Sequence, residues 1–211
     1  MMEESMESEQ LKIFNENREV IGEASREDVH KKGYWHEVFH CWLVSKEEAG
    51  TYVYLQLRSK DKKDYPNLLD ITAAGHLLAN ETVVDGVREV KEELGIDVTI
   101  DDLISLGVID YCVTKDRFID KELANVFLHT SNKSFDKFTL QAEEVAGMFK
   151  ADFNDFCNLW HGEVETLMVS GFEVDDDGSE IEVKRQVGKD HFVPHPESFY
   201  HTVIHRIKEK I

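Results

Sequence analysis

The 211-residue sequence has few cysteines, few basic residues and no long apolar run. Its apolar stretches fall short of the roughly 20 residues that a membrane-spanning helix needs, so we expect no membrane partner. The first ten residues, MMEESMESEQ, are acidic and polar, which is typical of neither a signal peptide nor a transit peptide. We interpret residues 1–10 as a flexible acidic tail.

The three cysteines are Cys41, Cys112 and Cys157. They are odd in number, widely spaced and form no CxxC motif, which predicts buried free thiols in a reducing, cytoplasmic compartment.

Basic residues are scarce relative to acids. Lys and Arg number 24 against 43 Asp and Glu, which gives a formal net charge of −19. No basic stripe is present that would neutralise a phosphate backbone, so we exclude a nucleic-acid polymer as the main partner. The same charge disfavours anionic membrane surfaces.

What the chain does have is an ordinary globular balance, with 41% hydrophobic and 32% charged residues. No repeat, linker or break in composition divides it, so we predict one domain over residues 11–211, with residues 166–211 as a C-terminal extension. The predicted helices are a short one capped by Ser25 and ended by Gly33, one in FNDFCNLWHG, and one in HPESFYHTVIHRIKEKI. The predicted strands are a hairpin over residues 11–22, the segments WHEVFHCWLVS, TYVYLQLRS, DITAA, DVTI, ISLGVIDYCVT, ELANVFLHT and EEVAGMFKAD, and a late hairpin turning at residues 176–178. These elements indicate an α/β fold with helices flanking a mixed sheet.

The segment GHLLANETVVDGVREVKEELGI, residues 75–96, carries the strongest functional signal. Thr82 and Asp85 form a capping pattern and Gly95 a C-terminal stop, which predicts a helix over about Val83–Leu94. Its valines and Leu94 share one stripe, which we expect to pack on the sheet. Glu89, Glu92 and Glu93 share the opposite side, so we expect their carboxylates to project away from the sheet.

Clustered carboxylates repel each other by a few tenths of a kcal/mol per pair, so a solvated acidic face is one interpretation. The upstream loop favours another, because Gly75 and Glu81 bring a backbone carbonyl and a further carboxylate near these acids. Mg²⁺ prefers such oxygen ligands, often together with substrate phosphates. The pattern therefore points to cleavage of a diphosphate by metal-activated water.

Residues 75–96 resemble the Nudix box, G-x5-E-x7-R-E-U-x-E-E-x-G-U, in which U is aliphatic. Gly75 and Glu81 match its first half, and the run from Arg88 to Ile96 matches its second half. Six residues separate Glu81 from Arg88 where the pattern has seven, which puts the placement of Glu81 in question.

The resemblance implies a Nudix α/β/α sandwich with a mixed sheet. It also implies Mg²⁺- or Mn²⁺-dependent hydrolysis of a nucleoside diphosphate derivative or another organic diphosphate. A homodimer is a further expectation from the family. Glu89, Glu92 and Glu93 would be metal ligands, one of them serving as general base, with the Ala74 carbonyl as a further ligand. Arg88 would orient the carboxylates.

Most of residues 11–165 resembles the branch that includes isopentenyl-diphosphate isomerase, in the stretches WHEVFHCWLV, LQLRSKDKKDYPNLLDITAAGH and DKELANVFLH. That enzyme binds metal outside the box. The matching positions here are His36, His76 and Glu122, with His30 and Asp120 aligned less securely. Ala74 stands where the isomerase has its catalytic cysteine, and alanine transfers no proton, so hydrolysis is favoured over isomerisation.

Other candidate residues keep two interpretations. Arg58 and Lys60 are candidate diphosphate ligands or a solvated strand end. His36 and His76 either bind substrate phosphate or pair structurally, and Glu122 either binds metal or faces solvent. Trp35, Tyr65 and Phe118 line a pocket or belong to the core or a lid. We interpret His40 as a satisfied strand residue, Glu143 and Glu144 as strand-start acids, and His201 with His205 as no metal site. A non-catalytic binding module with the same fold is the alternative function.

Overall fold

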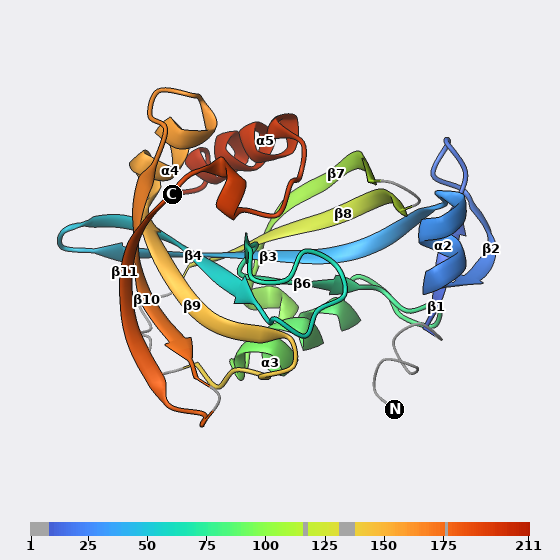
Figure 1. Cartoon of the computed structure of the whole chain (residues 1–211). Coiled ribbons are helices and arrows are strands. Elements are labelled where there is room, and N and C mark those ends of the chain that lie inside the picture. Colours follow the sequence, from blue (N-terminus) through green and yellow to red (C-terminus); the bar gives the residue numbers. More distant parts are fainter. Residues whose placement is uncertain (1–8, 116–117, 131–137, 176) are drawn as a thin grey trace.

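The computed structural model describes residues 9–115, 118–130, 138–175 and 177–211. These residues form one 11-stranded mixed sheet with helices on both faces (Figure 1). The predicted α/β class and α/β/α layering are therefore confirmed. Within the described residues no helix is long and apolar enough to cross a membrane.

The strands are β1 (Gln10–Phe14), β2 (Val20–Ser25), β3 (Trp35–Glu47), β4 (Gly50–Arg58), β5 (Leu69–Asp70), β6 (Ala73–His76), β7 (Ile104–Lys115), β8 (Phe118–Thr130), β9 (Val145–Asp152), β10 (Leu167–Val174) and β11 (Glu180–Val187). The helices are α2 (Arg26–Lys32), α3 (Arg88–Leu94), α4 (Phe153–Trp160) and α5 (Glu197–Lys208), with 3-10 turns η1 (Asp85–Val87), η2 (Ile100–Asp102) and η4 (Lys189–His191). The main strand order is β11-β10-β9-β4-β3-β1-β2, while β5 pairs with β4, β6 and β8 pair with β3, and β7 pairs with β8. Strands β3 and β8 run parallel, and the other named pairs are antiparallel.

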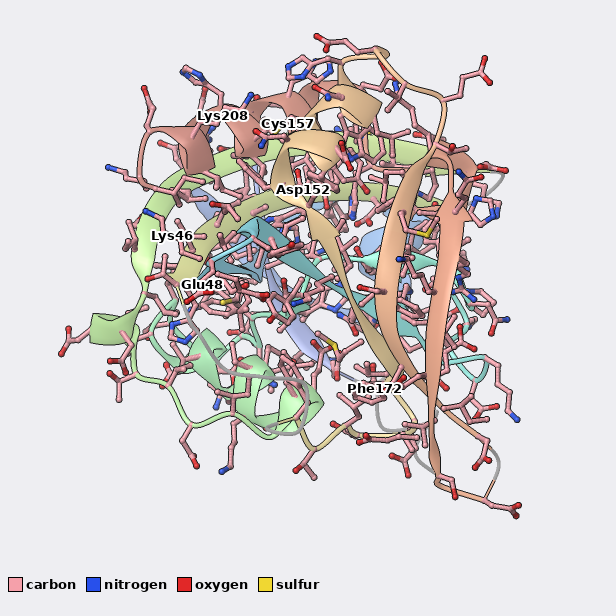
Figure 2. All side chains as sticks on the ribbon, turned by 90° about the vertical axis from the view of Figure 1, so that its left-hand side faces the viewer. Lys46, Glu48, Asp152, Cys157, Phe172 and Lys208 are labelled. Carbon is pink, nitrogen blue, oxygen red and sulfur yellow. The ribbon has the colours of Figure 1, made fainter. Side chains whose placement is uncertain are left out.

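Two apolar clusters fill the spaces on either side of the sheet. The larger one packs α4 and α5 against β3, β4 and β8, and the smaller one packs α3 against the other face. Cys157 on α4 belongs to the larger cluster and Phe172 on β10 to the smaller one, and Figure 2 shows Cys157 near the top of the molecule and Phe172 below it. Side chains of one strand enter both clusters in turn, because neighbouring strand residues point to opposite faces of the sheet.

The N-terminal elements agree with the prediction from residue 11 onward. The Ser25 side chain accepts a hydrogen bond from the Asp28 backbone at the start of α2, and Gly33 ends that helix in the left-handed conformation. The predicted tail is too long by at least one residue, because Gln10 pairs with Ser25 in the first hairpin. Residues 1–8 lie outside the described residues.

The box helix is shorter than predicted. Its α-helical part begins at Arg88, and residues 85–87 form a 3-10 turn instead. The reason is local, because the backbone and hydroxyl of Thr82 both donate to the Asp85 carboxylate, which closes a separate turn before the helix. The apolar stripe is as predicted, with Val90 and Leu94 buried in the smaller cluster.

Three further differences concern short segments. The predicted strand DVTI is wrong, because Thr99 and Asp102 cap a 3-10 turn there. The segment DITAA contributes to two short strands, β5 and β6, rather than one. The late hairpin is present, with β10 paired to β11 from Leu167 to Val174, and its predicted turn includes residue 176, which lies outside the described residues.

All three cysteines are free thiols, as expected. Cys41 and Cys157 are buried, and burial raises the pKa of the Cys41 thiol to about 12. Cys112 is exposed on β7, so the prediction of burial is wrong for this residue.

Candidate active site

Two box carboxylates are buried between α3 and the end of β6. The Glu93 carboxylate accepts hydrogen bonds from the Ala74 backbone over 3.0 Å and from the Gln56 side chain over 3.3 Å. Glu89 lies beside it and is also buried. The prediction that these acids project away from the sheet is therefore wrong for Glu89 and Glu93, while Glu92 is exposed.

Gly75 makes this approach possible. A Cβ atom at this position would overlap the Glu89 carboxylate, so any side chain would push Glu89 away from β6. The glycine that opens the box thus serves close packing of a strand end against a helix. A glycine is needed here for lack of space and not for its backbone conformation, which other residues can also adopt.

Arg88 connects the acidic residues. Its guanidinium donates to Glu81 over 2.6 Å and to the His76 carbonyl over 3.1 Å, and it lies 2.7 Å from Glu89 and 2.9 Å from Glu92. Glu81 also accepts from the Leu78 backbone. The missing residue of the box therefore leaves Glu81 within reach of Arg88, where it positions the arginine.

The burial of two neighbouring carboxyl groups has a measurable electrostatic effect. Burial, with repulsion from nearby acids, raises the pKa of Glu89 to about 7 and the pKa of Glu93 well above its usual value. Two carboxylates this close favour either a shared proton or a bound cation. Carboxylates beside the Ala74 backbone form an oxygen-rich set that fits Mg²⁺ or Mn²⁺.

A second cluster lies beside the first and is rich in histidine. Ring nitrogens of His30, His36 and His76 lie within 4.8 Å of one another, and so do ligand atoms of His36, Asp120 and Glu122. The sheet register explains the meeting, because β3 and β8 run parallel with His36 opposite Glu122. The five positions matched through the isomerase resemblance are thus close in space.

This histidine cluster has unmet hydrogen-bonding capacity. The His36 Nε2 and Asp120 Oδ1 atoms are buried and find no hydrogen-bond partner among the described residues. Burial lowers the pKa of His36 to about 4 and the pKa of His76 well below its usual value, so both rings are neutral near pH 7. Neutral imidazoles combined with carboxylates fit a transition-metal ion.

Both clusters open into one cavity of about 650 Å³. The cations on its wall are Arg26, Arg58, Lys62, Lys63 and Arg88. Lys62 forms an ion pair with the Glu144 carboxylate, which also lines the cavity. The site therefore combines two clusters of potential metal ligands with basic side chains that suit an anionic substrate.

The predicted diphosphate ligands behave differently from one another. Arg58 donates to the Asp64 and Tyr65 carbonyls and, over 2.9 Å, to Asp70, so it holds the following loop in place. Lys60 is exposed and is not part of the cavity wall.

Of the three predicted pocket aromatics, two line the cavity. Phe118 stacks on the His30 ring with centroids 4.5 Å apart, and the Tyr65 ring centroid lies 5.1 Å from the Lys115 Nζ. Trp35 instead donates to Glu16 at the surface.

Sequence reasoning missed several cavity residues. Lys62 and Lys63 follow the predicted Lys60 by two and three positions. Glu144, predicted only to begin a strand, also lines the cavity. The prediction that His40 is a satisfied strand residue is wrong for one ring nitrogen. Its Nε2 lies 3.4 Å from Glu122, but its buried Nδ1 has no hydrogen-bond partner among the described residues. His195 reaches the cavity through a contact with Asp70, 125 residues earlier in the chain, and no local sequence pattern predicts it.

The last helix shows no metal pair in its two spaced histidines. His201 Nε2 lies 2.9 Å from the Trp160 carbonyl, and the exposed His205 lies 3.6 Å from Glu209.

The chain is 36% identical over 204 residues to an uncharacterized Nudix hydrolase of Clostridium acetobutylicum, which covers 97% of this chain and 99% of the relative. The chain belongs to the Nudix hydrolase family. It is therefore an enzyme of the class that hydrolyses diphosphate bonds. No family model matches the chain.

Two further similarities concern another enzyme sequence and a solved fold. The Nudix chain is 28% identical over 141 residues to an isopentenyl-diphosphate Delta-isomerase of Aliivibrio fischeri, covering 66% of this chain and 77% of that enzyme. A MutT/nudix family protein of Enterococcus faecalis shares the fold with a TM-score of 0.53 and 15% identity, covering 82% of this chain and 62% of that one.

Proposed function

We propose that this Nudix hydrolase uses a divalent metal, Mg²⁺ or Mn²⁺, to hydrolyse a diphosphate linkage in a nucleoside diphosphate derivative or another organic diphosphate. The observation that carries the proposal is the burial of two neighbouring carboxylates at the end of β6, Glu93 on the Ala74 backbone and Glu89 against Gly75. The cavity that they line also holds Lys62 and Lys63. Burial of paired acids beside lysines suits a cation and a phosphate together.

Each residue has a defined part in this proposal. Glu89, Glu92 and Glu93, with the Ala74 carbonyl, would hold the metal, which when bound neutralises phosphate charge and makes water more acidic. Arg88 fixes the carboxylates through its ion pairs. Lys62, released from Glu144, and Lys63 would bind the phosphate oxygens. One box carboxylate accepts the proton of the attacking water.

The histidine cluster supports a further ion in the same cavity. His30, His36, His76, Asp120 and Glu122 supply neutral nitrogens and carboxylate oxygens, and two of their atoms are buried without partners among the described residues. We propose that this cluster binds a transition metal such as Mn²⁺ and adds to the neutralisation of the diphosphate.

The same cluster is the one observation that favours a second activity, isomerisation of isopentenyl diphosphate. Ala74 opposes it, because the side chain at this position can neither donate nor accept a proton. We expect no conversion of isopentenyl diphosphate to its allylic isomer.

A metal-dependent substrate screen tests these functions. The protein, stripped with EDTA, is incubated with nucleotide and isoprenoid diphosphates with Mg²⁺, Mn²⁺ or neither, and products are identified by mass spectrometry. We expect phosphate or monophosphate release only with metal. Thermal stabilisation by a ligand without any product would indicate the alternative binding module.

We also propose a reducing, cytoplasmic location. Three free thiols, one of them exposed, support it, since such thiols are typical of reducing compartments.

A further inference from the structure

The C-terminal extension reaches into the cavity through His195, which lies between η4 and α5. Two hydrogen bonds of 2.9 Å hold this segment in place. The Val193 backbone N–H donates to the Leu69 carbonyl of β5, and the Tyr200 hydroxyl of α5 donates to the Val193 carbonyl. The His195 side chain is 10% exposed and lines the cavity. A segment outside the box thus contributes a rigidly held imidazole to the site.

Asp70 sets the orientation of this imidazole. The His195 Nε2 lies 3.2 Å from Asp70 Oδ1, and the other Asp70 oxygen accepts from Arg58 over 2.9 Å. Burial alone would raise the pKa of Asp70, but the hydrogen bond from His195 and the charge of Arg58 hold it well below its usual range. With Nε2 bound to a carboxylate, Nδ1 remains available, and it has no partner within the described part of the chain.

His40, on β3, is held by a carboxylate in the same way. Its Nε2 lies 3.4 Å from Glu122, while its Nδ1 is buried and has no hydrogen-bond partner among the residues that the structure describes. The ring centroids of His40 and His195 are 6.2 Å apart. Two imidazoles, each anchored by a carboxylate, therefore each leave one nitrogen for a ligand.

The surroundings of these rings restrict what the ligand can be. Tyr111 and Phe199 lie beside both imidazoles, with ring centroids 5.1 to 6.4 Å apart. The charged residues that contact the two rings, Asp70 and Glu122, are acids. The nearby cation, Arg58, is occupied by Asp70 and loop carbonyls. An anionic group would be repelled here, whereas a hydroxyl group can both donate to and accept from an imidazole nitrogen.

We propose that His195 and His40 form a subsite for a neutral, hydroxyl-bearing part of the substrate, of the sugar type, attached to the diphosphate. This inference rests on the proposed function for the diphosphate end of the site. It makes His195 a specificity-determining residue and assigns a role in substrate selection to the C-terminal extension.

The test compares two non-hydrolysable probes, α,β-methylene-ADP and its 2′,3′-dideoxy analogue, by calorimetry with Mg²⁺ in the full-length protein. We expect the wild type to bind the hydroxylated probe at least about tenfold more tightly, which corresponds to about 1.4 kcal/mol. In His195→Phe, which keeps an aromatic ring against Phe199, this preference should fall to less than threefold. His195→Asn, whose amide can occupy the Nδ1 position, should retain part of the preference.

His205→Phe is the matched control, because His205 is exposed on α5 outside the cavity, and its probe preference should equal that of the wild type. The proposal is overturned if the wild type binds both probes equally or binds neither. It is also overturned if His195→Phe weakens both probes by the same factor, since that indicates a purely structural role. Binding does not require turnover, so an inactive protein that shows the expected preference refutes the hydrolase function while supporting the subsite.

Discussion

At the scale of single residues, buried charge organises this protein. Glu89 and Glu93 are buried side by side, and Arg88 pairs with the first of them and with Glu81. A folded chain keeps such an arrangement only if hydrogen bonds, protons or cations compensate the loss of hydration. The Ala74 backbone and the Gln56 side chain supply part of that compensation for Glu93.

The first prediction concerns Glu93→Gln. The amide keeps the shape and size of the side chain but cannot neutralise a cation, so we expect kcat/KM to fall more than about a hundredfold at saturating Mg²⁺. Asp97→Asn is the control, since Asp97 is an exposed acid just beyond the same helix. Equal activity in both variants would contradict a metal-binding role for Glu93.

The second prediction concerns stability and pH without metal. Because the folded-state pKa of Glu89 is raised from 4.5 to about 7, its contribution to stability is present below pH 4.5 and is lost as the pH rises to about 7. His36, with its pKa lowered to about 4, opposes this trend between pH 4 and 6.5. The informative quantity is therefore the difference in stability between a Glu89 variant and the wild type at each pH.

We therefore compare melting temperatures of Glu89→Gln and the wild type in EDTA. The advantage of the variant should be small at pH 4.5 and should increase up to about pH 7. In Mg²⁺ the order should reverse, since only the wild type keeps the carboxylate. A difference that does not change with pH would refute the raised pKa.

At the scale of elements, the end of α3 is tied to a distant loop. Gly95 ends the helix with a φ of 68°, and the backbone N–H groups of Thr139 and Gln141 bond to the last helical carbonyls, those of Leu94 and Glu93. These bonds hold the C-terminal end of α3, which carries Glu93, against the segment before β9.

The third prediction tests that contact with Gly95→Ala. The new Cβ would lie 2.7 Å from the Thr139 Cβ in a left-handed backbone, so two costs combine. Gly162→Ala is the matched control, because Gly162 has a similar φ of 74° but nothing within 4 Å of the new atom. We expect Gly162→Ala to lose about 1 kcal/mol of unfolding free energy and Gly95→Ala clearly more, measured by urea denaturation. Equal losses in the two variants would show that the segment around Thr139 moves away from the new Cβ at no cost in unfolding free energy.

At the scale of the whole molecule, the C-terminal extension is part of the main core. Phe199, Val203 and Ile207 of α5 lie in the same cluster as Trp42 and Val126 of β3 and β8. The apolar side chains of α5 are therefore buried in a core shared with the rest of the domain, and this helix covers one face of the shared sheet (Figure 1).

The fourth prediction follows from this shared core. Ile207→Ala should lower the unfolding free energy by about 2–5 kcal/mol and leave one cooperative transition in which fluorescence and circular dichroism coincide. Two separated transitions would show that the extension unfolds independently of residues 11–165. The homodimer implied by the family resemblance stays a prediction.

The sequence by itself determined the local features of this protein. Capping by Ser25, the stop at Gly95 and the apolar stripe through Val90 and Leu94 follow from nearest-neighbour chemistry along the chain. The run from Arg88 to Ile96 likewise identified the family, because its ligand types and spacing lie on one element.

Only the tertiary structure decided which side chains meet. It buried Glu93 under Ala74, occupied Arg58 with Asp70, and brought His195 to His40 from the far end of the sequence. The parallel pairing of β3 with β8 set the histidine cluster in register. These contacts join residues that no sequence period relates, because strand order and burial, rather than local propensity, determine them.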